Sequence, residues 1–167
     1  MIRVVVDDLA FVDVDAVVRP ATDLLEPTAS ALRNLDEIGG PRFKQQLQIR
    51  DPMAIGAAVV TDAGELASEF VIHAIIRSAS EQVSADGVRR ALVSALQRAV
   101  TWQFSAVALP PVGTGPGNLP IERAAQLMCE VLRAHTEQET FPSDVQIVVE
   151  TEEEKTMFEH LLGTATQ

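Results

Sequence analysis

The chain has 167 residues, 47% of them hydrophobic, and its 24 acidic and 13 basic side chains give a formal net charge of −11 at pH 7. This length fits a single domain over residues 1–167, with a substantial core and a flexible tail at 163–167. The acidic balance argues against nucleic-acid binding, because affinity for a phosphate backbone depends on Lys and Arg. No apolar run is long enough for a signal peptide or a membrane span, which predicts a cytoplasmic protein without membrane contact.

The composition also limits the core and the chemistry. Aromatic residues make up 4% of the chain and Tyr is absent, so Val, Leu, Ile and Ala must fill the interior, as in a sheet flanked by helices. The lone Cys129 cannot form a disulfide within the chain, and no zinc-ligand spacing accompanies it. We interpret Cys129 as a small buried apolar residue and expect neither a metal site nor a cofactor.

Strand-like and helical patterns alternate along the chain. Runs rich in β-branched residues predict six strands, at Ile2–Val6, Ala16–Val18, Ala57–Thr61, Phe70–Ile76, Ala106–Leu109 and Val145–Val149. The alternation predicts a mostly parallel sheet covered by helices on both faces. In such a sheet a ligand binds at the carboxyl ends of the strands.

Two helices are predicted between the second and third strands. The first runs over Pro27–Ile38, with Thr28 as its cap, and is stopped by Gly39-Gly40-Pro41. A shorter helix follows at Phe43–Ile49.

Three further helices have clearer start signals. Ser84 can cap a long helix that follows the surface loop Arg77–Asp86, and another amphipathic helix starts at Ile121. Thr151 with Glu154 forms a capping box for the last helix.

The most informative motif joins the strand Ala106–Leu109 to the helix at Ile121. Gly113, Gly115 and Gly117 fall within five residues, so successive amides can point at an anion without an obstructing Cβ. Pro120 suits a helix start, where the free amides favour phosphate. The motif matches neither the Walker A pattern nor G-x-G-x-x-G. The alternative interpretation is a tight connection without a ligand.

Several segments, in their order and spacing, resemble the macro domain family, whose members bind ADP-ribose and in some branches hydrolyse its derivatives. The matching segments are Asp8-Leu9 with Val14-Asp15-Ala16-Val17-Val18, Gly56-Ala57-Ala58-Val59-Val60-Thr61, Phe70-Val71-Ile72-His73-Ala74, and Pro111-Val112-Gly113-Thr114-Gly115 through Leu119-Pro120 and Ala124-Ala125. Together they cover nearly the whole chain. The resemblance implies a three-layer α/β/α fold with a central mixed, mostly parallel sheet of about six strands.

The resemblance also implies a small-molecule nucleotide such as ADP-ribose as ligand, with Asp8 accepting a hydrogen bond from the adenine amino group. The candidate ligand-binding residues are Asp8, Leu9, Thr22, Ser30, Gly113, Thr114, Gly115, Pro116, Gly117 and Asn118.

The chain departs from the family pattern at three places, and the first two departures favour binding over hydrolysis. Arg19-Pro20-Ala21-Thr22 stands where the family has Asn-Ala-Ala-Asn, whose asparagines surround the distal ribose. Thr28-Ala29-Ser30-Ala31-Leu32-Arg33 replaces the glycine-rich first loop, and Gly117 replaces an aromatic residue of the second. We therefore assign no catalytic residue.

Individual polar residues have competing interpretations. Asp8 is either an adenine contact or a solvated strand-end acid. Arg19 either pairs with a ligand phosphate or, as we favour, forms a salt bridge. His73 lies in an apolar strand and is more simply a buried, hydrogen-bonded residue than a general base.

Three hypotheses for function follow. The first is binding of ADP-ribose or a related nucleotide, and the second is hydrolysis of O-acetyl-ADP-ribose, an ADP-ribosylated protein or an ADP-ribose phosphate. The third is a vestigial pocket in a protein that acts through assembly, for example as a homo-oligomer. An open, amide-lined cleft would favour binding, whereas a cleft filled by Leu32 or Arg33 would favour the third hypothesis.

Overall fold

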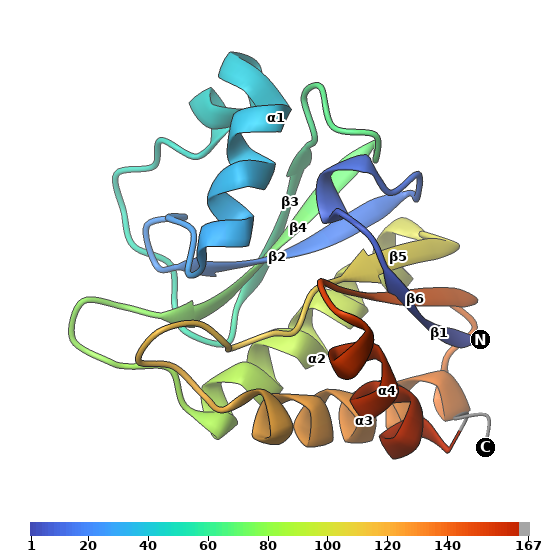
Figure 1. Cartoon of the computed structure of the whole chain (residues 1–167). Coiled ribbons are helices and arrows are strands. Elements are labelled where there is room, and N and C mark those ends of the chain that lie inside the picture. Colours follow the sequence, from blue (N-terminus) through green and yellow to red (C-terminus); the bar gives the residue numbers. More distant parts are fainter. Residues whose placement is uncertain (164–167) are drawn as a thin grey trace.

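The computed structural model describes residues 1–163, in which six strands form one mixed sheet (Figure 1). The strands are β1 (Ile2–Val6), β2 (Ala16–Thr22), β3 (Ala58–Asp62), β4 (Phe70–Arg77), β5 (Ala106–Leu109) and β6 (Asp144–Val149). Their order is β1-β6-β5-β2-β4-β3, and every pair is parallel except β3 with β4. All six predicted strands are confirmed, although β2 extends beyond Val18 to Thr22.

The helices cover both faces of the sheet, which confirms the three-layer α/β/α prediction. They are α1 (Ser30–Gln46), α2 (Ala85–Trp102), α3 (Ile121–Gln138) and α4 (Glu152–Leu162), and a short 3-10 helix, η1 (Leu9–Phe11), follows β1. Figure 1 shows α1 on one face and the other three α-helices on the opposite face. Residues 1–163 contain no helix that is long and apolar enough to span a membrane.

The strand alternation divides the core between the two faces. Ala16 and Val18 of β2 belong to the large cluster that includes α2, α3 and α4. Val17 points to the other face and belongs to a smaller cluster with Leu35 and Phe43 of α1. Because successive side chains of a strand alternate between faces, β2 anchors helices on both sides of the sheet.

The start of α1 differs from the prediction. The helix begins at Ser30 rather than Pro27, and its N-cap is Ala29, whose extended backbone has no side-chain oxygen to offer. Thr28 is therefore not the cap, and its hydroxyl instead donates to the Pro20 carbonyl at 3.5 Å. Pro27 pairs with Ala21 in an isolated antiparallel bridge, so the chain is held beside the end of β2 just before α1 begins.

The helix stop predicted at Gly39-Gly40-Pro41 is a kink within α1 rather than the end of a helix. Gly40 has a φ of 82° inside α1, and Pro41 follows it. Helix resumes through Gln46, so the two predicted helices are two parts of one kinked element. A left-handed glycine followed by proline interrupts the ladder of helical hydrogen bonds without ending the helix.

The other predicted caps are confirmed. Ser84 Oγ accepts from Gly87 N–H at 3.0 Å, and Thr151 Oγ1 accepts from Glu154 N–H at 3.2 Å. Gly163 ends α4 with a φ of 72°. The remainder of the predicted tail, 164–167, lies outside the described residues.

Candidate ligand-binding cleft

A cleft of about 530 Å³ opens where β5 and β2 diverge at their carboxyl ends. The two strands pair only through Ala16 and Val17, after which β2 leads to α1 on one face and β5 leads to α3 on the other. A crevice at such a point is the usual ligand site of an open α/β sheet. Its lining comprises Val6, Asp7, Asp8, Leu9, Thr28, Ala29, Ser30, Ala31, Leu32, Asn34, Pro110, Pro111, Thr114, Gly115, Pro116, Ile121, Val148, Glu150 and Glu154.

One wall of the cleft is the loop between β5 and α3, which depends on glycine. Gly113 and Gly115 have φ values of 91° and 120°, and a Cβ on Gly113 would lie 2.7 Å from Val88 Cγ2. The loop is closed by hydrogen bonds from Leu119 N–H to Gly113 O at 2.9 Å and from Asn118 N–H to Gly115 O at 3.0 Å. Within residues 1–163, the amides of Thr114 and Gly115 donate to no protein acceptor.

The opposite wall is the first turn of α1. The amides of Leu32 and Arg33 donate to Ala29 O at 3.1 and 3.3 Å, whereas those of Ser30 and Ala31 have no acceptor in the described part of the chain. Because Ala29 has no capping oxygen, two helix-terminal donors stay uncommitted. The residues that carry these uncommitted N–H groups line the same cleft from two sides, and the first turn of α1 adds the positive end of a helix dipole.

Asn118 joins the walls at the end of the cleft near Thr28. Its side-chain amide donates to Thr114 O at 3.1 Å and to Thr28 O at 3.5 Å. Gly115 approaches the same carbonyl so closely that a Cβ would lie 3.2 Å from Thr28 O. The loop wall and the segment before α1 are thus in direct contact.

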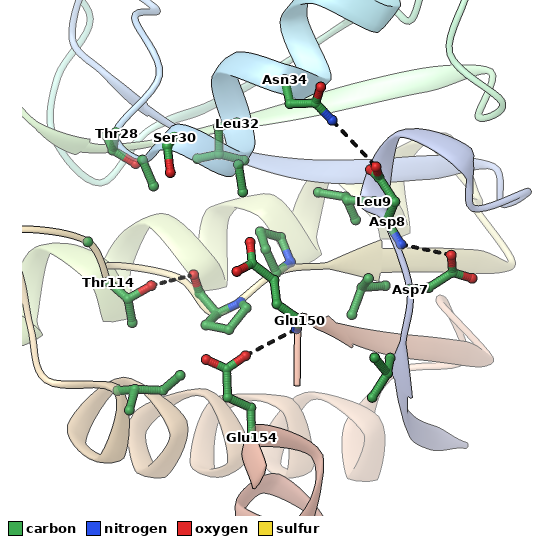
Figure 2. Close-up of a pocket in the computed structure, with 18 of the residues that line it drawn as sticks. Asp7, Asp8, Leu9, Thr28, Ser30, Leu32, Asn34, Thr114, Glu150 and Glu154 are labelled. Atoms are coloured by element: carbon green, nitrogen blue, oxygen red, sulfur yellow. Dashed lines mark hydrogen bonds between the residues drawn. The ribbon is translucent and has the colours of Figure 1, made fainter. Parts of the chain in front are cut away.

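Acidic side chains line the other end of the cleft and one of its sides. Asp8 Oδ1 accepts from Ala10 N–H at 3.0 Å, and its Oδ2 accepts from the Asn34 side-chain amide at 3.4 Å. Glu150 follows β6, and its N–H donates to Glu154 Oε1 at 3.1 Å. Figure 2 shows Asp8 at the opposite end of the cleft from Thr28, with both glutamates along one side. Among the described lining residues there is no Lys, Arg or His.

The structure brings together six of the predicted site residues. Asp8, Leu9, Ser30, Thr114, Gly115 and Pro116 line the cleft, whereas Thr22, Gly113, Gly117 and Asn118 do not. Thr22 Oγ1 accepts from Leu24 N–H at 3.3 Å and from Glu26 N–H at 3.1 Å, so its hydroxyl stabilises a turn. Sequence reasoning missed Glu150, although its place directly after a predicted parallel strand marks it by the rule that identified Asp8.

Arg19 is fully buried and lies outside the cleft, in a network of hydrogen bonds behind the α1 wall. Its Nε and Nη2 donate to the two carboxylate oxygens of Asp36 at 2.8 and 2.7 Å, and Nη2 also donates to Leu25 O at 2.9 Å. This bidentate pair confirms the salt-bridge interpretation. It ties β2 to α1, which carries one wall of the cleft.

His73 completes the network as a neutral side chain. Arg19 has only donors, so His73 Nδ1 accepts from Arg19 Nη1 at 3.3 Å and the Nε2–H donates to Thr61 Oγ1 at 2.8 Å. Burial, together with the charge of Arg19, lowers the pKa of His73 to about 3. The expectation of a buried, hydrogen-bonded histidine is confirmed.

Cys129 is also buried, and burial raises the pKa of its thiol to about 11. A protonated, inaccessible thiol is a poor nucleophile, which agrees with the predicted apolar role.

Comparisons with known proteins agree with this architecture. The family model described as Macro domain matches residues 20–128. The chain is 34% identical over 133 residues to an uncharacterized protein from Aquifex aeolicus, covering 79% of this chain and 81% of that protein. It is 28% identical over 172 residues to a Cronobacter sakazakii protein named O-acetyl-ADP-ribose deacetylase, covering 97% and 93% of the two chains.

Solved structures show the same fold. A mutant of the Oceanobacillus iheyensis macrodomain with ADPR superposes with a TM-score of 0.84 at 19% identity, covering 96% of this chain and 90% of that one. The chain spans only 38% of an uncharacterized Mycobacterium tuberculosis relative, so similar domains also occur within longer proteins. The family model covers well over half of the chain, and the chain belongs to the macro domain family.

Proposed function

We propose that this protein binds ADP-ribose or a closely related adenine nucleotide in the cleft, as a binding module rather than a hydrolase. The observation that carries the proposal is the pair of facing walls whose amides, at Thr114 and Gly115 and at Ser30 and Ala31, have no protein acceptor within residues 1–163. Two phosphates placed between the walls would satisfy these donors. Backbone amides and a helix N-terminus bind phosphate without needing a basic side chain.

The acidic end supports a base with an amino group. Asp8 uses one carboxylate oxygen for Ala10 N–H, and its other oxygen has only a long 3.4 Å contact with Asn34 among the described residues. A carboxylate has lone pairs to spare for an exocyclic amine such as that of adenine. Leu9 and Val6 supply apolar surface for the ring at the same end.

Two relatives favour this ligand class. The Oceanobacillus iheyensis structure holds ADPR, and the Cronobacter sakazakii protein is named for a derivative of ADP-ribose. The open volume of the cleft also argues against a vestigial pocket, because Leu32 lines it without filling it.

Hydrolysis has less support in this chain. Arg19 stands near the strand end where hydrolytic members have asparagines, and its guanidinium is committed to Asp36. No Ser or Thr in the described lining is hydrogen-bonded to a His or Lys that would activate it.

Isothermal titration calorimetry with ADP-ribose tests the proposal. We expect one site per chain. IDP should bind at least about tenfold more weakly than ADP, because its base carries a carbonyl oxygen in place of the adenine amino group that would donate to Asp8. An absence of both heat and thermal shift at millimolar ADP-ribose would refute the proposal. If light scattering then showed a stable oligomer, an assembly role would be favoured.

Incubation with O-acetyl-ADP-ribose and with mono-ADP-ribosylated protein tests the alternative. We expect no product above the uncatalysed background. Turnover that disappears in Gly115→Glu would establish a hydrolase instead.

A further inference from the structure

The chain that leaves β2 folds back over the end of that strand. Thr22 N–H donates to Glu26 O at 2.8 Å, Leu25 N–H donates to Thr22 O at 2.9 Å, and Ala21 pairs with Pro27. Leu25 has a φ of 62° and is buried. Residues 23–28, here named the return segment, thus form a compact turn against β2.

Polar groups at the end of β2 are used to hold this return segment. The guanidinium of Arg19 donates to Leu25 O at 2.9 Å, and Thr28 Oγ1 donates to Pro20 O at 3.5 Å. The hydroxyl of Thr22 accepts two amides of the turn. Within residues 1–163, the cleft lining contains no residue of β2. The return segment thus lies over the strand end, and no residue of the strand end lines the cleft in the described part of the chain.

The return segment also limits the cleft at this end. Gly115 and the Asn118 side chain both approach Thr28 O from the opposite wall. Figure 2 shows Thr28, Ser30 and Thr114 together at this end, on the two walls that carry the free amides. A ligand that runs from Asp8 towards these amides therefore meets a contact between the walls before it reaches β2.

We propose that the cleft selects the adenosine diphosphate part of its ligand and does not discriminate among groups attached to the second phosphate. This inference rests on the proposed function. The terminal ribose of ADP-ribose would lie towards solvent, because the strand end that would surround it is covered by the return segment. The ligand class is accordingly ADP and ADP-sugars, with ADP-ribose as one member.

This arrangement also bears on catalysis. A sugar that is not held contributes little binding energy and is not oriented for attack by water. The return segment would therefore explain two expected properties of the cleft. It would accept different groups attached to the second phosphate, and it would not catalyse their hydrolysis.

Calorimetry with ADP-ribose, ADP-glucose, ADP and AMP tests this inference. ADP-ribose and ADP-glucose carry the same charge and differ in the terminal sugar, so we expect their dissociation constants to agree within about threefold. AMP should bind at least about tenfold more weakly than ADP because it lacks the second phosphate. ADP-ribose binding more than about tenfold tighter than ADP-glucose would overturn the inference. Failure of all four ligands to bind would instead refute the proposed function.

Substitution at Thr22 provides a second test. Thr22→Ala removes the hydroxyl at the strand end, and Thr22→Ser retains it as a matched control. We expect the ratio of ADP-ribose to ADP affinity to be unchanged in both variants, even if the loosened turn lowers both affinities. Selective loss of ADP-ribose binding by about fivefold or more in Thr22→Ala alone would show that the ribose reaches β2 and would overturn the inference.

Discussion

The two walls of the cleft offer the same chemical group and are built in different ways. The β5–α3 loop exposes amides because Gly113 and Gly115 take up left-handed backbone conformations. The α1 wall exposes amides because Ala29 leaves the helix uncapped. Backbone amides can thus be left without a protein acceptor either by adding glycine or by omitting a capping side chain.

The walls also differ in what holds them. The loop wall packs on α2, where Gly113 leaves no room for a Cβ beside Val88. The α1 wall is tied to β2 by the buried Arg19–Asp36 pair, whose guanidinium also holds the return segment through Leu25 O. Changes behind the α1 wall should therefore reduce stability, whereas changes in the loop wall should reduce binding.

Arg19→Met should have the largest effect. It leaves the Asp36 carboxylate buried without its partner, and breaking such a pair costs about 3–5 kcal/mol of unfolding free energy. Urea denaturation measures the change. The control is Arg3→Met, which breaks the exposed Arg3–Asp144 pair and should cost about 0–1 kcal/mol. Equal costs for the two variants would contradict the assigned role of the buried network.

Acid should lower the free energy of unfolding through His73, which belongs to the buried network behind the α1 wall. Its pKa in the folded protein is about 3, below the ordinary value of 6.5, so the unfolded chain binds the extra proton first as pH falls. The contribution of neutral His73 is complete above about pH 6.5 and declines by about 1.4 kcal/mol per pH unit towards pH 3. Gln can make both hydrogen bonds without titrating, so His73→Gln should unfold with a shallower pH dependence. Parallel curves for the two proteins from pH 7 to 4 would disprove this linkage.

Gly115→Glu tests the loop wall. A side chain there would meet Thr28 O and place a negative charge beside the free amides, so ADP-ribose affinity should fall at least about 100-fold, or ~2.7 kcal/mol. Gly117→Glu is the matched control, since Gly117 has a φ of 78° and a Cβ added there would meet no described atom within 4 Å. That variant should lose no more than about threefold in calorimetry. Similar losses in both would indicate a general charge effect.

Ala29→Ser should have the smallest effect and separates stability from binding. A serine at this extended N-cap can accept from the uncommitted N–H of Ala31, which should stabilise the protein by about 1 kcal/mol. The same bond removes a donor from the ligand, so ADP-ribose should bind about five- to tenfold more weakly. Ala29→Gly adds no acceptor and should leave affinity unchanged. Tighter binding by the serine variant would show that these amides do not bind the ligand.

The two walls were not equally predictable from the sequence. Gly113 to Gly117 indicated the loop wall directly, because closely spaced glycines mark an unusual backbone. The α1 wall has no such signature. Thr28 was predicted as the cap because its residue type suits that role, but tertiary pairing of Pro27 with Ala21 places the helix start later, at Ser30.

The acidic end shows a similar limit. Asp8 could be identified because it follows the first predicted strand. Glu154 was assigned only to a helix cap, and its place in the cleft depends on how α4 packs beside β6. Residues that one motif brings together are thus easier to predict than residues that meet through the packing of separate elements.

The absence of a basic residue from the described cleft lining should reverse the usual effect of ionic strength on the binding of a phosphate-bearing ligand. Most phosphate sites lose affinity in salt because screening weakens attraction to Lys and Arg. Asp7, Asp8, Glu150 and Glu154 would share the cleft with the proposed phosphate-bearing ligand, so screening should chiefly relieve repulsion. Added salt should favour the complex, and a low-salt buffer would understate its affinity.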